Sequence, residues 1–297
     1  MTLLTIGLPV FNGDNFLEKA LASIAAQTFT DFRVHISDNG STDRTAEMAA
    51  DWAAKDARFY HDRLEENCGA AENFNRILRK CETPYFRWHA HDDVMLPDLL
   101  QVCVDGMRAD DTLIGCTTKS SFIGPQGEHI GADIPDLSIL QATPSQRMGH
   151  WLLRHSRCDA IFGLYRTDIL QQTVQIPSCR GGDQITLCEL SILGPRLEVP
   201  RPLLLLRQHP DRITAESASD EKIAKWFDPT TTLPKGSARA HLLRGKLAMV
   251  RVQDLSFSEA LRCRLILYYW YLRQTAIWPF KGFIKRSLIR VGLRRSS

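Results

Sequence analysis

Two adjacent acids, Asp92 and Asp93, close a largely apolar run that begins at Pro84 and ends shortly before Pro97. The apolar run predicts a buried strand, which would place both carboxylates at its carboxyl end. Carboxylate oxygens are the ligands that Mg²⁺ and Mn²⁺ prefer, and these ions commonly bridge to substrate phosphates. The pair therefore predicts a site for a divalent cation and a phosphate-bearing ligand.

Two further polar clusters lie where a predicted strand gives way to a helix. Residues 9–12 read Pro-Val-Phe-Asn, and residues 38–43 read Asp-Asn-Gly-Ser-Thr-Asp. In open α/β sheets, ligands bind in the crevice beyond the carboxyl ends of the strands. We therefore expect all three clusters to meet at one edge of a sheet.

Short apolar segments alternate with helical periodicity through the first half of the chain. Strands are predicted at 3–9, 32–36, 59–64, 85–90 and 113–118, with helices between them. This alternation predicts an α/β fold with a mostly parallel sheet flanked by helices.

The second half of the chain is less regular. A polar stretch at 215–237, with two prolines and a glycine, indicates a boundary. We predict one domain over 1–215, followed by a polar linker and a helical, basic extension over 216–297. The elements expected before that boundary are a loop at 122–143, helices at 145–155 and 183–193, and strands at 160–165 and 203–206.

Composition sets further bounds on the protein. Of its 297 residues, 44% are hydrophobic and 24% are charged, which is enough apolar material for a sizeable core. The eight cysteines are scattered without zinc spacing or a compact disulfide framework, which favours a reducing compartment. The sequence shows no signal peptide and no run of about 18 apolar residues, so we expect a cytoplasmic protein without a membrane-spanning helix.

The motifs, taken in order, resemble the inverting glycosyltransferases of family 2, which have the GT-A (Rossmann-like) fold. The resemblance covers roughly residues 1–215. It implies metal-dependent transfer of a sugar from a nucleoside diphosphate, UDP in particular, to a hydroxyl of a glycan or lipid-linked glycan in polysaccharide biosynthesis. The segments that carry it are residues 8–12 (Leu-Pro-Val-Phe-Asn), 37–43 (Ser-Asp-Asn-Gly-Ser-Thr-Asp), Asn67-Cys68-Gly69 with Asn73, and Asp92-Asp93 with Pro97.

In this family the first motif borders the nucleotide base, which implies that role for Pro9, Phe11 and Asn12. Phe11 stands where tyrosine is commoner, and it could instead be a core residue of a strand-to-helix turn. Asp38 resembles the acid that accepts a hydrogen bond from uracil, and a carboxylate suits the N3–H donor of that ring. An Asx-turn is the structural alternative for Asp38.

The resemblance extends the nucleotide site to Gly69, Asn73, His91 and Asp92. Gly69 would allow close approach of the backbone, and Asn73 would add polar contacts. For His91, contact with the sugar nucleotide and a purely structural role remain open alternatives.

The implied cation is Mn²⁺ or Mg²⁺, held by Asp92, Asp93 and His209. The family commonly carries an Asp-x-Asp motif, but Ala90 replaces its first acid here. One or two carboxylates together with diphosphate oxygens and water still suffice for such an ion. The missing acid puts ribose contact and metal affinity in question, and His209 could equally be a surface histidine.

Inverting transfer needs a carboxylate that accepts the proton of the acceptor hydroxyl. Asp183, which opens the helix predicted at 183–193, resembles the family's general base; a helix N-terminal cap is its structural alternative. On the acceptor side, the resemblance points to Trp151, Tyr165 and Arg166.

From Leu261 onward the chain carries nine Lys or Arg and no Asp or Glu, so the net charge before it is +3 − 9 = −6. Basic and aromatic residues together suit an anionic membrane surface, so we expect peripheral association at the inner face of the membrane through this tail. The alternative is a helix packed on the body with solvated arginines. Nucleic-acid binding is disfavoured because the body is acidic and carries no recognition motif.

Three other functions compete with sugar transfer. A catalytically silent nucleotide- or glycan-binding module is suggested by Ala90. A nucleotidyltransferase would need a Gly-rich basic loop after the first strand, and residues 12–15 (Asn-Gly-Asp-Asn) supply none. A dinucleotide dehydrogenase is disfavoured because Gly-x-Gly-x-x-Gly is absent there.

Overall fold

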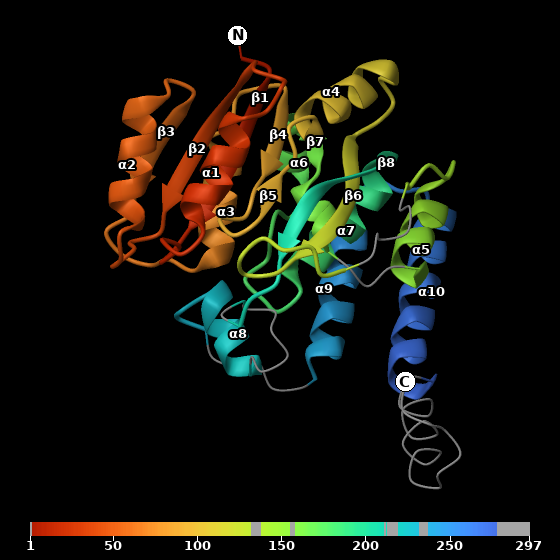
Figure 1. The fold of residues 1–297 in the computed structure, drawn as a ribbon. Helices are drawn as coiled ribbons and strands as arrows, with labels where there is room; N and C mark the ends of the chain where they lie inside the picture. The colour runs from red at the N-terminus through yellow and green to blue at the C-terminus, as the bar shows by residue number, and fades with distance from the viewer. Residues whose placement is uncertain are drawn as a thin grey trace, which may run out of the picture.

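The computed structural model describes residues 2–131, 138–154, 158–210, 212, 219–231 and 237–277. Within them, one mixed sheet of eight strands forms the centre of the molecule, with helices on both faces (Figure 1). The strands are β1 (Leu4–Val10), β2 (Phe32–Asp38), β3 (Phe59–Arg63), β4 (Tyr85–Trp88), β5 (Val94–Met95), β6 (Gly115–Ile123), β7 (Leu164–Arg166) and β8 (Arg196–Arg207).

The helices alternate with the strands in the first half and cluster in the second. The first-half helices are α1 (Leu17–Ala25), α2 (Thr45–Lys55), α3 (Ala70–Arg79) and α4 (Leu99–Ala109). The second-half helices are α5 (Pro144–Arg154), the short η1 (Asp159–Phe162), α6 (Thr167–Gln172), α7 (Gly182–Leu193), α8 (Asp220–Phe227), α9 (Ala238–Val252), α10 (Phe257–Leu272) and the π-helical turn η2 (Arg273–Ile277).

The strand order is β3-β2-β1-β4-β7-β6-β8-β5. β1, β2, β3 and β4 pair in parallel, as do β6 and β8. β7 pairs antiparallel with both β4 and β6, and β5 pairs antiparallel with β8. The predicted α/β sheet flanked by helices is confirmed, with the antiparallel pairings confined to the two shortest strands.

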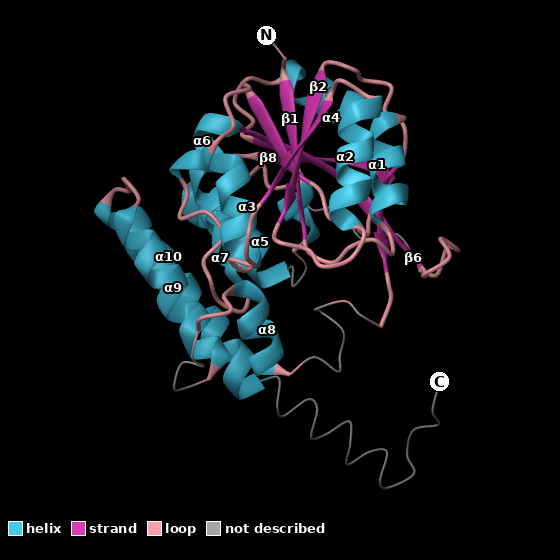
Figure 2. Cartoon of the chain, turned by 90° about the vertical axis from the view of Figure 1, so that its left-hand side faces the viewer, coloured by secondary structure: helices cyan, strands magenta, loops and turns pink. Residues whose placement is uncertain are grey.

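Both faces of the sheet are covered, which explains why β1 reads as a continuous apolar run rather than an alternating one. Every residue of β1 is buried. Figure 2 shows the sheet edge-on, with α1 and α2 on one side and α3, α6 and α7 on the other. Two hydrophobic clusters correspond to these sides, one around Leu21, Val34 and Leu100 and the other around Trp88 and Leu187.

The C-terminal helices pack on the second of these clusters. α10 contacts α5 and α9, and α9 contacts α7. Cys263, Leu267 and Trp270 of α10 are buried in the same cluster as Leu187. The predicted boundary after residue 215 remains a prediction, and residues 278–297 of the predicted membrane tail lie outside the described residues.

The polar stretch at 215–237 contains a helix that the sequence reasoning missed. α8 buries Ile223, Ala224 and Phe227 on one face and contacts α3. Ser219 caps it by accepting a hydrogen bond from the backbone N–H of Lys222. The helix was overlooked because its apolar residues are few and its flanks are rich in polar residues.

Candidate active site

The carboxyl ends of β1, β2 and β4 lie in step at one edge of the sheet. Val10 is opposite Asp38, and Gly7 is opposite Trp88. The loops that follow are tied to β1, because the N–H of Asn39 donates to the Val10 carbonyl (2.9 Å) and the N–H of His89 donates to the Gly7 carbonyl (2.9 Å). The three polar clusters of the sequence therefore share one rim.

Hydrogen bonds to the 38–43 cluster fix the turn that follows β1 at residues 9–12. Asn12 adopts a positive φ of 49°, and its N–H donates to the Ser41 hydroxyl at 2.9 Å. Its side-chain oxygen accepts from the N–H of Thr42 at 2.8 Å. Pro9 is buried within β1, whereas the ring of Phe11 is 40% exposed beside this turn. The geometry leaves an exposed aromatic ring at the rim, not a core phenylalanine.

Asp38 is fully buried, yet one of its oxygens has no hydrogen bond. Oδ1 accepts from the N–H of Ser41 at 2.9 Å, which is the turn-forming bond that the Asx-turn alternative describes. Oδ2 lies 3.4 Å from Arg63 Nε and has no hydrogen-bond partner among the described residues. Because buried acceptors are normally satisfied, Oδ2 is suited to accept from a ligand N–H.

The loop before α3 packs against α8 and against Ser37 of β2. Gly69 has a φ of +86°, and a Cβ there would lie 2.4 Å from the Phe227 carbonyl oxygen, so α8 closes over it. Asn73 is buried and exchanges two hydrogen bonds with Ser37, to its hydroxyl at 2.6 Å and to its carbonyl at 2.9 Å. Both residues shape the loop beside Asp38, and the protein itself satisfies the Asn73 amide.

Asp92 and His209 meet at the rim from the ends of β4 and β8. His209 Nε2 lies 3.1 Å from Asp92 Oδ2, and the two side chains are 6% and 15% exposed. Burial raises the pKa of Asp92, but the hydrogen bond from His209 and the nearby positive charge of Arg212 act against it, and the pKa falls to about 2. Asp92 is therefore a carboxylate at neutral pH.

Asp93 lies behind Asp92 and serves the fold. It is 4% exposed, and its Oδ1 accepts from the backbone N–H of Arg207 at 2.9 Å. Burial and the neighbouring charge of Asp92 raise its pKa well above the usual range. Since adjacent acids point in different directions, the structure brings only Asp92 into contact with His209, and Asp93 ties the chain after β4 to the end of β8.

His91 packs near the same place, because a Cβ at Gly13 would lie 2.5 Å from its ring. Burial lowers the pKa of His91, which favours the neutral ring.

The donor set can be tested against a divalent cation. No group of three or more His, Cys, Asp and Glu suited to a metal occurs in the described part of the chain. Asp92 Oδ2 and His209 Nε2 nevertheless lie close together, and His209 Nδ1 has no hydrogen-bond partner among the described residues. One carboxylate plus substrate phosphates and water is a usual arrangement for Mg²⁺, and imidazole is compatible with Mn²⁺. The pair fits a cation whose remaining ligands come from a diphosphate.

Asp183 lies in the first turn of α7. Two residues separate α7 from β8, and the first turn of α7 lies beside Cys158, which precedes η1, and near Lys246 of α9. Asp183 Oδ1 accepts from the N–H of Gln184 at 2.8 Å. Burial raises its pKa, although a hydrogen bond with the Cys158 thiol and the charge of Lys246 oppose the shift.

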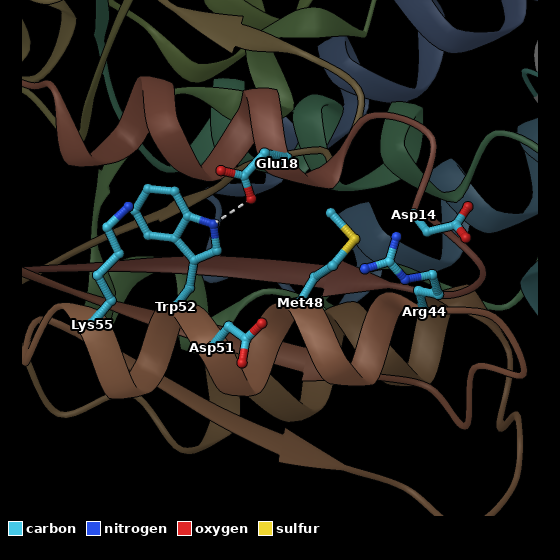
Figure 3. A pocket seen from close by; sticks show the side chains of 7 residues that line it. All are labelled: Asp14, Glu18, Arg44, Met48, Asp51, Trp52 and Lys55. Carbon is cyan, nitrogen blue, oxygen red and sulfur yellow. Dashed lines mark hydrogen bonds between the residues drawn. The ribbon is translucent and has the colours of Figure 1, made fainter.

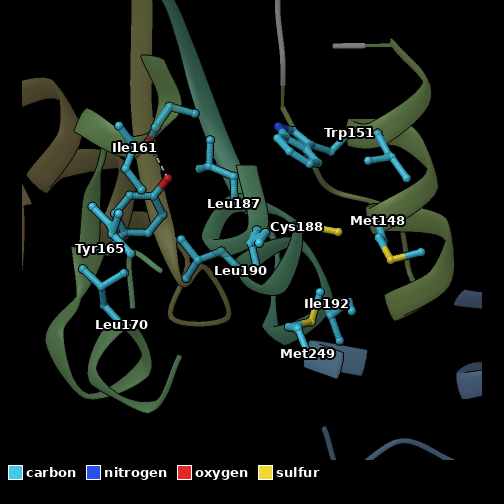
Figure 4. Packing of buried hydrophobic residues seen from close by; sticks show 14 of the residues in the cluster. Met148, Trp151, Ile161, Tyr165, Leu170, Leu187, Cys188, Leu190, Ile192 and Met249 are labelled. Carbon is cyan, nitrogen blue, oxygen red and sulfur yellow. Dashed lines mark hydrogen bonds between the residues drawn. The ribbon is translucent and has the colours of Figure 1, made fainter. Parts of the chain in front are cut away.

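The residues expected on the acceptor side are separated by the fold. Tyr165 is 1% exposed, and its hydroxyl donates to the Ala160 carbonyl at 2.6 Å. Arg166 is opposite Tyr85, at the amino end of β4, and donates to the Leu113 carbonyl at 2.9 Å. The structure places both away from the rim because β7 inserts antiparallel between β4 and β6. Trp151 lies on α5 beside α7 (Figure 4).

Among the described residues, two cavities that lie outside the rim differ in their linings. One of about 450 Å³ lies between α1 and α2 and mixes acids and bases, including Asp14, Glu18, Arg44 and Lys55 (Figure 3). It contains none of the predicted site residues. A smaller cavity of about 220 Å³ lies between α5, α7, α9 and α10, and Trp151 forms part of its wall.

Sequence reasoning missed several charged residues around the site. Arg63 faces Asp38, Arg212 adds positive charge near Asp92, and Lys246 does so near Asp183. Arg63 ends a strand and is opposite Asp38 in the β2–β3 register, so strand pairing offered a signal for it. Lys246 lies 63 residues after Asp183 on a separate helix, and no local pattern identifies it.

The chain is similar in sequence to known glycosyltransferases. A sequence model described as Glycosyl transferase family 2 matches residues 5–171. An uncharacterized glycosyltransferase of Rickettsia typhi is 31% identical over 99 residues, which are 33% of this chain and 30% of that protein. A chondroitin synthase of Escherichia coli is 30% identical over 132 residues, or 43% of this chain and 18% of that protein. The chain thus spans less than a third of the length of these relatives.

Solved structures share the fold. TarS residues 1–349 of S. aureus, in complex with UDP-GlcNAc, superpose with a TM-score of 0.69 at 15% identity, covering 92% of this chain and 74% of that one. The mannosyltransferase PcManGT of Pyrobaculum calidifontis, in complex with GDP-Man and Mn²⁺, gives 0.57 at 16% identity, covering 99% and 76%. The predicted GT-A class of fold is confirmed by these likenesses.

Proposed function

Because the chain belongs to glycosyltransferase family 2, we propose that it transfers a sugar from a UDP-sugar, with inversion, to a hydroxyl of a glycan or lipid-linked glycan. The observation that carries the proposal is the shared rim, where Asp38 Oδ2 accepts no hydrogen bond from the described residues and Asp92 meets His209. The UDP-GlcNAc complex of TarS and the chondroitin synthase relative support a UDP-sugar and polysaccharide synthesis.

On the donor side, the uracil N3–H donates to Asp38 Oδ2, which has no other hydrogen-bond partner among the described residues. Phe11 borders the base, and Asn12, Gly69 and Asn73 hold the loops around it. Asp92 and His209 hold Mn²⁺ or Mg²⁺, with Asp93 behind them, and the PcManGT complex with Mn²⁺ supports a divalent ion. When bound, such an ion neutralises the charge of the departing diphosphate.

On the acceptor side, Asp183 is the general base. The acceptor oxygen attacks the anomeric carbon, its proton passes to the Asp183 carboxylate, and the bond from the anomeric carbon to the diphosphate oxygen breaks to release UDP. A base with a pKa raised by burial is a better proton acceptor than an exposed aspartate. Trp151 is the acceptor-side aromatic residue that lies beside α7.

Peripheral membrane association is part of this proposal, because α10 leaves an apolar stripe uncovered. At 100° per residue, the stripe covers about 120° of the helix surface, opposite the buried Cys263, Leu267 and Trp270. Arg262 and Arg264 flank it on its two sides, which suits an anionic bilayer surface. The exposed residues of the stripe are Phe257, Leu261, Leu265, Tyr268, Tyr269 and Leu272.

No helix in the described residues is long and apolar enough to cross a membrane.

The direct test is UDP release from a panel of UDP-sugars with Mn²⁺ or Mg²⁺. We expect Asp183→Asn to lower transfer by about 10²–10⁴-fold, the usual contribution of a general base. Asp92→Asn should raise the concentration of metal needed for half-maximal rate. Asp51→Asn, an exposed acid on α2, is the matched control and should leave both unchanged. Transfer at the wild-type rate in both active-site variants would contradict these roles.

A silent binding module is the second candidate, and Ala90 in place of the first acid favours it. It predicts UDP binding that is indifferent to metal, without turnover of any donor. The same panel, read with and without EDTA, therefore separates the two functions.

A further inference from the structure

The cavity of about 220 Å³ between the C-terminal helices and α7 carries an unusual set of side chains. Two indoles and two cations contribute to its wall, together with two amides. The residues concerned are Trp151, Gln184, Arg239, Lys246, Trp270 and Gln274. Gln184 follows Asp183 directly in α7, so the cavity adjoins the proposed general base.

Two buried hydrogen-bond donors in this wall have no acceptor. Lys246 is 0% exposed and Trp151 is 3% exposed. Neither Lys246 Nζ nor Trp151 Nε1 has a hydrogen-bond partner among the described residues. Nearly all buried polar groups in folded proteins are paired, and each exception calls for an explanation. Two buried donors without hydrogen-bond partners in the wall of one cavity point to a missing oxygen-rich ligand.

Two aromatic rings stabilise the charge of Lys246 but provide no hydrogen-bond acceptor for its ammonium group. Its Nζ lies 3.9 Å from the centroid of the Trp270 ring and 5.8 Å from that of Trp151. Such cation–π contacts favour a cation but accept no hydrogen bond. Burial lowers the pKa of Lys246, while the charge of Asp183 opposes the shift. An anion close to Nζ would complete the site.

We propose that this cavity binds a phosphate group of the acceptor, with Lys246 and Trp151 donating to its oxygens and Arg239 adding charge. Two cations suit a phosphate dianion better than they suit a carboxylate, which carries a single negative charge. Arg239 already donates to the Gln274 carbonyl at 3.2 Å, which holds it beside η2 and leaves other N–H groups for the ligand.

The volume and the location of the cavity favour the acceptor substrate, rather than the nucleotide-sugar donor, as its ligand. At about 220 Å³, it is below the usual range for a drug-sized ligand and suits a phosphate with part of one ring, not a nucleotide sugar. The donor residues Asp38 and Asp92 contribute nothing to its wall. The inference rests on the proposed function in that a phosphate held here would present a neighbouring hydroxyl toward Asp183.

The test is calorimetric titration of the full chain, first saturated with UDP, using glucose 6-phosphate and the neutral match glucose. We expect glucose 6-phosphate to bind and glucose not to bind. Lys246→Met keeps the length and packing of the side chain without its charge, and should weaken binding by about tenfold to hundredfold, the effect of losing a charged hydrogen bond. Trp151→Phe keeps an aromatic ring without the donor and should weaken binding severalfold.

Arg251→Gln removes an exposed cation from the same helix and is the matched control, expected to bind like wild type. Farnesyl phosphate in place of glucose 6-phosphate distinguishes a lipid phosphate from a sugar phosphate, according to which binds more tightly. Equal binding of glucose, or unchanged glucose 6-phosphate binding in both Lys246→Met and Trp151→Phe, would overturn the proposal. Because UDP release from a UDP-sugar is scored separately, loss of this site is distinguishable from failure of sugar transfer.

Discussion

Glu189 in α7 should make the stability of this protein depend on pH between about 4.5 and 7. Its side chain is buried, and its two oxygens accept from the backbone N–H of Val174 and from Gln253 Nε2, each at 2.7 Å. Burial raises its pKa from 4.5 to about 7, although both hydrogen bonds oppose that shift. Within this pH window the folded state keeps a proton that the unfolded state releases.

The sign and size of the effect follow from proton linkage. Below pH 4.5 both states are protonated, and the full stabilisation is present. As pH rises toward 7, the unfolded state alone ionises, so the free energy of unfolding falls. A shift of about 2.5 units corresponds to at most about 3 kcal/mol lost by pH 8.

Replacing Glu189 with glutamine removes the titrating group and keeps the shape. The Gln253 amide can rotate so that its oxygen accepts from the new side-chain NH₂, while the new oxygen still accepts from Val174. We expect Glu189→Gln to unfold at higher urea concentration than wild type at pH 8, and the difference to shrink toward pH 5. Urea unfolding curves at pH 5, 6, 7 and 8 measure this. Parallel stability curves for the two proteins would refute the reasoning.

Three further outcomes follow from the site and from α10. Asp38→Asn should weaken UDP binding by about tenfold to hundredfold by calorimetry, since an amide in this place can present a donor to the uracil N–H; unchanged affinity would remove Asp38 from the base site. Because burial raises the pKa of Asp183, kcat/KM should fall on acidification at a pH above 3.8 as the base becomes protonated, and a pH profile that is flat down to pH 4 would contradict that role. The double variant Leu265→Gln with Leu272→Gln should co-sediment less than wild type with vesicles of anionic lipid, while zwitterionic vesicles, as the control, bind neither protein; equal sedimentation would exclude the stripe.

The sequence predicted the rim because strand ends are locally encoded. Apolar runs fix where β1, β2 and β4 stop, and the polar residues that follow each run must then lie at one edge of a parallel sheet. Asp38 and Asp92 were found in this way. The same reasoning could not tell Asp92 from Asp93, because the direction of each side chain depends on the distant end of β8, where Arg207 donates to Asp93.

The acceptor side was harder to predict because it is assembled from remote segments. The resemblance placed Tyr165 and Arg166 on the acceptor side, but β7 enters the sheet antiparallel and puts Arg166 opposite Tyr85, at the amino end of β4. Strand direction in a mixed sheet is decided by tertiary pairing, which periodicity does not report. Trp151 lies beside α7, yet its partners Lys246 and Trp270 come from the segment that the sequence pattern assigned to a separate extension.

Close packing explains why those C-terminal helices bear on the site. A Cβ at Gly181, just before α7, would lie 2.8 Å from Leu242, and a Cβ at Gly245 would lie 2.6 Å from Ile185. Both contacts join α9 to the first turn of α7, within a few residues of Asp183. Packed interiors transmit displacements rather than absorb them. The position of α9 therefore determines both where the Lys246 ammonium group lies and where α7 begins. Asp183, the proposed general base, and the cavity beside it are therefore positioned by the same contact between α7 and α9, and a ligand that moves α9 would act on both.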